Sequence, residues 1–153
     1  MITEDYVDFS TAKLLKEKGF KEWCSCAYGI SVRHNGEEID EDEEYELKSE
    51  GKGNEIEYVE GGTLYGMNYD NSKDFASLYA CPTQAMAMKW LREVHGLFIS
   101  IGNDDLNWCW QILDINHRDE NLDPKVMSDS YGCNDSYEEA VSNGLVYCLE
   151  NLI

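Results

Sequence analysis

Apolar residues recur at helical spacing in three segments of the chain. We expect the first helix to begin at Phe9 and run for about ten residues, with Asp8 as its N-cap and Gly19 as the left-handed residue after its end. The second helix begins near Pro82 and stops at Gly96. Its predicted buried stripe follows the i, i+3, i+4, i+7 pattern and consists of Ala87, Trp90, Leu91 and Val94.

The third helical segment occupies the end of the sequence. The pair Ser136 and Glu139 has the spacing of a capping box, which predicts the start of this helix. The pattern predicts one buried face, made of Ala140, Val141, Leu145, Cys148, Leu149 and Leu152.

Alternating apolar positions predict the strands. The first strand lies within residues 23–33, and its inward face is expected to carry Cys24, Cys26, Tyr28, Ile30 and Val32. Residues 75–80 form a short extended piece before the second helix. A strand over 97–101 follows that helix directly, and a second strand covers 106–115. The last of these has apolar residues on both faces and is therefore expected to be central.

The order of these elements predicts the fold class. The sequence reads α-β-(ββ)-α-β-β-α, which is typical of an α+β protein with a mixed or antiparallel sheet of about four to five strands and three helices packed on it. Residues 116–134 lack periodicity and are predicted to form a long surface loop. No repeat and no boundary interrupts the pattern, so residues 1–153 are expected to form one domain.

Charge changes this picture most. The chain carries 31 Asp and Glu against 12 Lys and Arg, a formal net charge of −19. Residues 36–60 hold twelve acidic residues and two lysines, which gives −10, and this stretch is predicted to be an acidic surface insertion. Direct binding to nucleic acid or to an anionic membrane needs clustered cations and is therefore disfavoured, whereas a basic protein is a suitable partner.

Two interpretations of the acidic stretch remain open. It is a solvated loop, or it imitates the phosphates of a nucleic acid and meets the Lys and Arg of a nucleic-acid-binding protein. Tyr45 and Tyr58 would then serve as aromatic anchors. The binding residues predicted on this basis are Glu37, Glu38, Asp40, Glu41, Asp42, Glu43, Glu44, Tyr45 and Glu46.

The three helices also resemble a known group of proteins. The segment CPTQAMAMKWLREVH at 81–95 is similar to one that recurs in short uncharacterised proteins of Bacteroides-type gut bacteria and their phages. The resemblance extends to TAKLLKEKGF at 11–20, to SYEEA at 136–140 and to YCLEN at 147–151. It covers roughly a third of the chain and implies a phage or mobile-element origin, without implying a catalytic role.

Motifs for common chemistry are absent from the sequence. Cys24 and Cys26 lack the two-residue spacer of zinc and redox motifs, and the six cysteines are expected to be reduced and mostly buried. Hydrolysis by a Cys and His pair has no recognisable nucleophile motif. His95 is predicted to be a cation at a helix C-terminus. No cofactor or metal is expected, because the candidate cation ligands lack the spacing of an EF-hand; these are Asp104, Asp105, Asp114, Asp119, Glu120 and Asp123.

Two function classes and a third possibility follow. The first is a non-enzymatic, phage-related accessory protein in the cytoplasm of a bacterial host, whose acidic surface binds a basic partner; the sequence shows no signal peptide or membrane span. The alternative is a small-ligand-binding or enzymatic domain with a site near the start of the second helix. This alternative site would use Thr83, Gln84, Trp108, Trp110 and His117. The third possibility is a structural, oligomeric component.

Overall fold

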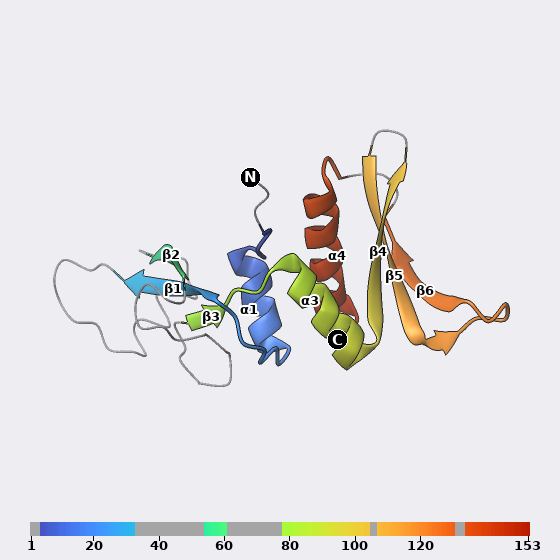
Figure 1. The fold of residues 1–153 in the computed structure, drawn as a ribbon, viewed down its shortest axis with the longest axis horizontal. Coiled ribbons are helices and arrows are strands. Elements are labelled where there is room, and N and C mark those ends of the chain that lie inside the picture. The colour runs from blue at the N-terminus through green and yellow to red at the C-terminus, as the bar shows by residue number, and fades with distance from the viewer. Residues whose placement is uncertain (1–3, 33–53, 61–77, 105–106, 131–133) are drawn as a thin grey trace. The chain divides into compact units, whose positions relative to one another are not determined.

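The computed structural model describes residues 4–32, 54–60, 78–104, 107–130 and 134–153. The chain forms two compact units, one of residues 8–82 and the other of residues 1–7 with residues 83–153. The sequence predicts a single domain and gives no signal for the division at residue 82. Helices and antiparallel strands are both present, so the fold is α+β, as predicted (Figure 1).

Helix α1 of the 8–82 unit has the limits that its capping residues predict. It spans Phe9–Glu17, and the Asp8 side chain accepts a hydrogen bond from the Thr11 backbone N–H at 2.8 Å. Gly19 follows the helix with φ 88°, a conformation that glycine adopts without strain. The next residue, Phe20, is fully buried, and its backbone N–H returns to the carbonyl oxygen of Leu15 at 2.9 Å.

A three-stranded antiparallel sheet completes this unit. Its order is β2-β1-β3, with β1 at Cys26–Val32, β2 at Asn54–Glu60 and β3 at Leu78–Ala80. Phe9 of α1 stacks edge-on against the rings of Tyr28 and Tyr79, with centroids 5.7 and 5.3 Å apart, so α1 packs on this sheet. The core includes Ala12, Leu15, Phe20, Cys24, Cys26, Ala27, Ala80 and Cys81.

The second predicted helix is built from two helical forms. Helix α3 covers Gln84–Trp90, and one π-helical turn, η1, covers Leu91–His95 before Gly96 ends it with φ 68°. Ala87, Trp90 and Leu91 are buried as predicted, but Val94 is 59% exposed, so its place in the buried stripe was wrong. A π turn has more residues per turn than an α-helix, which rotates Val94 off the buried side.

The second sheet is also antiparallel, in the order β4-β5-β6. It contains β4 at Leu97–Asp104, β5 at Asn107–Arg118 and β6 at Pro124–Asp129. The central position of β5 was predicted. The prediction of a long loop over 116–134 was wrong, because that range contains the end of β5 and all of β6. Strand β6 begins with proline and has mostly exposed side chains, so it lacks the alternation of a half-buried strand.

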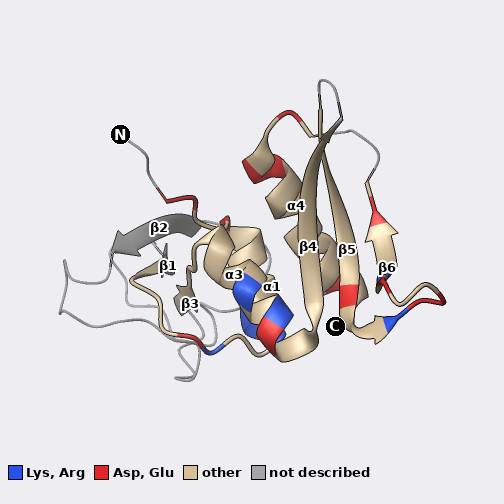
Figure 2. Ribbon diagram, turned by 45° about the vertical axis from the view of Figure 1, so that its right-hand side comes forward, with Lys and Arg blue, Asp and Glu red and all other residues tan. Residues whose placement is uncertain are grey.

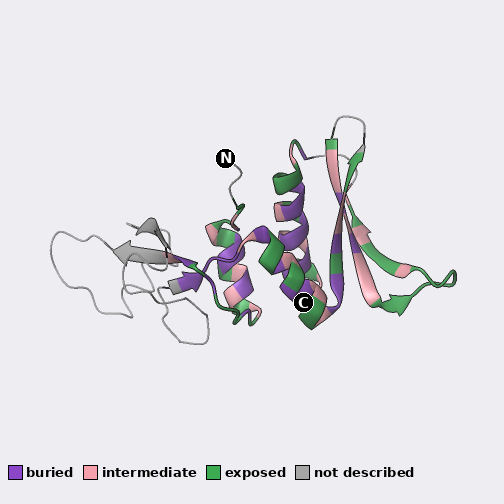
Figure 3. Ribbon diagram, viewed as in Figure 1, coloured by how far each residue is buried: buried purple, intermediate pink, exposed green. Residues whose placement is uncertain are grey.

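Helix α4, Tyr137–Asn151, covers one face of this sheet (Figure 3). Ser136 caps it by accepting from the Glu139 N–H at 3.0 Å, and the helix comes close to the strands at Gly144. A Cβ atom added to Gly144 would lie 3.0 Å from Cγ2 of Ile99 and 3.5 Å from Cβ of Trp110. Five of the six predicted inward residues are buried, and Leu152 is half-buried.

The predicted sheet of four to five strands is thus divided, since the strands described lie in two sheets of three. In the part of the chain that the structure covers, no helix has the length and apolar character needed to cross a membrane.

Candidate functional site

Gln84, the first residue of α3, connects three segments of its unit. These are α3 itself, the N-terminal segment that contains Asp5 and the start of α4. Its backbone N–H donates to the carbonyl oxygen of Asp5 at 2.8 Å, and its side-chain Nε2 donates to the carbonyl oxygen of Glu138 at 3.0 Å. The side chain is only 8% exposed. Thr83 beside it caps the helix, since its hydroxyl accepts from the Met86 N–H at 3.2 Å. The structure therefore gives both residues a structural role next to the site described below.

These contacts create a hollow with an acidic rim. The hollow has a volume of about 180 Å³. The starts of α3 and α4 and the segment before residue 7 surround it, and Figure 2 shows acidic residues in that segment and at the start of α4. We call this the acidic hollow; its lining contains two carboxylates and no Lys or Arg, and consists of Glu4, Asp5, Thr83, Gln84, Ala85, Met88 and Tyr137.

Three further carboxylates lie at the start of α4. Asp135, Glu138 and Glu139 are all exposed. The hydrogen bond from Gln84 to the Glu138 carbonyl oxygen holds this turn beside the acidic hollow. Part of their role is local, because Glu139 accepts from the Asp135 N–H at 2.7 Å and acidic residues stabilise a helix N-terminus. Together they make the surroundings of the hollow strongly negative.

Tyr137 is the aromatic wall of the hollow. Its side chain is 41% exposed, and its ring meets the ring of Trp108 edge-on, with centroids 5.5 Å apart. Trp108, a predicted site residue, thus supports the hollow by packing against Tyr137. Trp110, two residues along β5, is buried and packs on Tyr147 at 5.1 Å, so it belongs to the core.

A larger groove continues from the hollow between α3 and β4. Its volume is about 500 Å³, and it shares Ala85, Met88 and Tyr137 with the acidic hollow. Two cations lie at the opposite end from the carboxylates. We call it the α3–β4 groove; its lining is Ala85, Met88, Lys89, Arg92, Phe98, Ile99, Ser100, Ile101 and Tyr137.

Strand β4 presents backbone groups toward this groove. Within the residues that the structure describes, β4 pairs with β5 alone and is therefore an edge of its sheet. The Ile115 N–H donates to the Gly96 carbonyl oxygen, so alternate residues of β4 bond to β5. By this alternation the N–H and C=O groups of Ile99 and Ile101 point away from β5.

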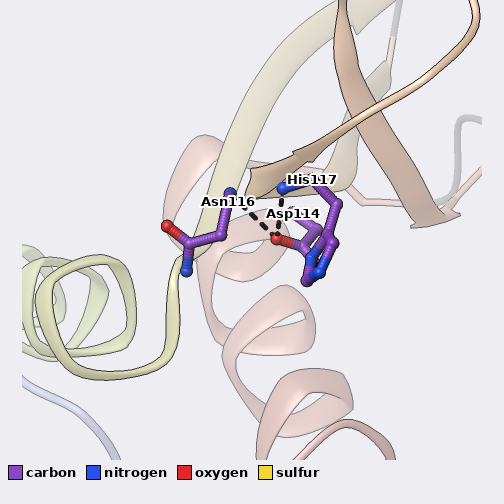
Figure 4. A network of polar contacts seen from close by, with 3 residues as sticks. All are labelled: Asp114, Asn116 and His117. Atoms are coloured by element: carbon purple, nitrogen blue, oxygen red, sulfur yellow. Dashed lines mark hydrogen bonds and ion pairs between the residues drawn. The ribbon is translucent and has the colours of Figure 1, made fainter.

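His117, the last of the predicted site residues, lies at the far end of β5 from Trp108. It forms a local cluster with Asp114 and Asn116 (Figure 4). The backbone N–H groups of Asn116 and His117 both donate to Oδ1 of Asp114. The ring Nδ1 lies 2.7 Å from Oδ2 of Asp114, and hydrogen bonding from this ring is the main cause of the lowered pKa of Asp114. His117 lines neither cavity, so the structure separates it from Thr83 and Gln84.

Two of the described thiols, Cys81 and Cys148, lack the properties of a hydrolytic nucleophile. The described cysteines are reduced, and burial raises the pKa of Cys81 to about 11 and that of Cys148 to about 12, which keeps both protonated near neutral pH. Burial lowers the pKa of His95, whose ring packs on Trp90 at 4.7 Å. Burial therefore favours the neutral imidazole, which disfavours the interpretation of His95 as a capping cation.

The remaining predicted residues, 37–46, lie outside the described residues. Among those described, no group of three or more His, Cys, Asp or Glu side chains is placed to hold a metal ion.

Sequence reasoning missed the site's main contributors, namely Glu4, Asp5, Lys89, Arg92 and Tyr137. The one available signal was a large aromatic residue inside the capping box at 136–139. Comparisons of the chain with protein-family models, with curated proteins and with solved structures found no match.

Proposed function

We propose that this chain is a non-enzymatic accessory protein, related to phages or mobile elements, that binds a basic protein partner through its acidic surface. The observation that carries the proposal is the acidic hollow. It combines the carboxylates of Glu4 and Asp5 with the exposed ring of Tyr137, and none of its lining residues is basic. A Lys or Arg side chain fits this chemistry, because carboxylates pair with its charge and an aromatic face attracts a cation.

The charge of the whole chain supports the same partner. At a formal charge of −19, the protein attracts basic surfaces over a distance set by the salt concentration. The stretch 36–60 contributes −10 of this charge. A partner that normally binds nucleic acid would meet carboxylates in place of phosphates, and the protein would then act as a nucleic-acid mimic.

The alternative of a small-ligand-binding or enzymatic domain has less support. Its predicted site requires Thr83, Trp110 and His117 to act together, whereas Thr83 caps a helix, Trp110 is a core residue, and His117 lines neither cavity. Binding of a protein partner needs no such convergence, because the hollow and groove are already formed by neighbouring residues.

Affinity capture with matched variants tests the proposal. The whole chain is immobilised and exposed to bacterial lysate at about 0.05 M and about 0.5 M salt, the bound proteins are identified, and displacement of DNA from each is measured. We expect basic proteins to be captured at low salt and released at high salt, and Glu4→Gln/Asp5→Asn to capture less of them. The control Glu120→Gln/Asp123→Asn removes the same charge at the β5–β6 turn. Equal capture by both variants, or capture without enrichment of basic proteins, would contradict the proposal.

A further inference from the structure

We infer that the α3–β4 groove binds an extended peptide segment of the partner, which adds to β4 as a fourth strand and has a carboxylate at the Lys89 and Arg92 end. This inference rests on the proposed function and names the form that the partner takes. The backbone groups of β4 that point away from β5, the dimensions of the groove and its two charged ends support it independently.

The backbone of β4 is the first argument. The N–H and C=O groups of Ile99 and Ile101 point away from β5, toward the groove that these residues line. An extended peptide would satisfy all four groups by main-chain hydrogen bonds, which is how β-strand addition gains affinity. Unpaired edge groups favour such pairing with another chain.

The dimensions agree with a short extended segment. Gln84 and Arg92, at the two ends of the groove and hollow, are eight residues apart on α3 and η1, which corresponds to about 12 Å along a helical axis. A strand rises about 3.4 Å per residue, so the span accommodates roughly four residues. Four residues reach from one charged end to the other. The apolar middle, with Ala85, Met88 and Tyr137, would contact alternate side chains.

The charges set the direction of the segment. Glu4 and Asp5 lie at one end, and Lys89 and Arg92 lie at the other. Arg92 Nε already lies 3.2 Å from Glu93 Oε1, but this pair is exposed on both sides and contributes little by itself. The guanidinium therefore remains accessible to a second carboxylate.

An antiparallel segment matches these ends. Strand β4 runs from the Arg92 end toward the Tyr137 end, so a segment antiparallel to it runs toward Lys89 and Arg92. A basic residue would enter the acidic hollow first, and the carboxylate would follow about four residues later. That carboxylate is either the free C-terminus of the partner or an acidic side chain.

Selection from a peptide library on the immobilised whole chain tests the inference. The probe is a display library of random short peptides with free C-termini, followed by fluorescence anisotropy with the enriched peptides. We expect enriched sequences with a basic residue, apolar or β-branched residues and then a carboxylate. Loss of binding on C-terminal amidation assigns the carboxylate to the C-terminus, and retained binding assigns it to an acidic side chain.

Two pairs of variants locate the site. Lys89→Glu/Arg92→Glu is expected to weaken binding at least about tenfold, while Arg118→Glu/Lys125→Glu, with the same charge change at the β5–β6 turn, leaves it unchanged. Ala85→Trp fills the groove and is expected to abolish binding. Met86→Trp places the same residue on the same helix but outside the groove lining, and is expected to bind normally.

Hydrogen exchange supplies the direct readout. Bound peptide should slow exchange of the Ile99 and Ile101 amides, which face the groove. No enrichment, unchanged binding by Ala85→Trp, or protection of these amides by self-association at high protein concentration without peptide would overturn the inference. In those cases, salt-sensitive capture that still depends on Glu4 and Asp5 would leave the proposed function standing.

Discussion

Gln84 at the start of α3 donates a hydrogen bond from its side-chain Nε2 to the backbone carbonyl oxygen of Glu138, 3.0 Å away at the start of α4. The two residues are 54 positions apart in the sequence. This bond, with the one from the Gln84 N–H to Asp5, holds together the walls of the acidic hollow. The site therefore depends on a buried amide whose role is invisible in the local sequence.

Replacing that amide should lower stability. Gln84→Met keeps the length of the side chain but removes the amide that donates to the carbonyl oxygen of Glu138, so we expect the free energy of unfolding to fall by about 1 kcal/mol. Urea unfolding measures the change. Gln111→Met, on the half-exposed face of β5, is the matched control and should change stability by less than about 0.5 kcal/mol. Equal effects of the two substitutions would show that the hydrogen bond contributes nothing.

Two glycines with positive φ separate backbone strain from side-chain displacement. Gly19 has φ 88° and open space where a Cβ would lie, whereas at Gly96, with φ 68°, a Cβ would meet the amide end of the exposed Asn116 side chain. That side chain can turn away, so we expect Gly19→Ala and Gly96→Ala each to lower the free energy of unfolding by about 1–2 kcal/mol, the strain of a left-handed conformation. Thermal and urea unfolding provide the values. A Gly96→Ala effect much larger than that of Gly19→Ala would contradict the free displacement of Asn116.

The turn between β5 and β6 contains a strained residue. Leu122 has φ 68° and is 79% exposed, so it has the strain of a left-handed conformation without the benefit of burial. Leu122→Gly is expected to raise the free energy of unfolding by about 0.5–1 kcal/mol. Val126→Gly, an exposed strand position, should lower it instead. A loss of stability in Leu122→Gly would mean that its side chain makes a stabilising contact.

His95 should make stability depend on pH. Burial lowers its pKa below the ordinary value of 6.5, so in mild acid the unfolded chain binds a proton that the folded chain does not. Its contribution to stability is therefore complete above pH 6.5 and falls as the pH drops toward the lowered value of the folded state. His95→Phe keeps a ring beside Trp90 but cannot titrate. As the pH falls from about 7.5 to about 5.5, the wild type should lose stability relative to His95→Phe. A constant difference between the two free energies of unfolding would refute the prediction.

Local signals in the sequence predicted the helix ends well. Asp8, Gly19, Gly96 and Ser136 all have the roles that their residue types indicate, because capping involves only a few neighbouring residues. The α+β class and the central position of β5 followed from apolar periodicity. These features depend on short-range chemistry that a single sequence contains.

The site was largely hidden because its residues meet through tertiary contacts. Asp5 and Glu138 come together only through Gln84, and Tyr137 gains its position from packing on Trp108. The edge of β4 became apparent only when the strands divided into two sheets. Of the residues predicted for the alternative site, Thr83 and Gln84 line the hollow and Trp108 supports it, whereas Trp110 and His117 do not.

The salt dependence of binding tests the central claim most directly. A basic protein captured by the chain is titrated by calorimetry at several salt concentrations, with the wild type, Glu4→Gln/Asp5→Asn and the control Glu120→Gln/Asp123→Asn. We expect the Kd of the wild type to rise steeply with salt, and the variant of the acidic hollow to bind more weakly at low salt with a flatter slope, while the control matches the wild type. A Kd that does not change with salt, or a hollow variant that matches the wild type, would contradict binding of a basic partner at this surface.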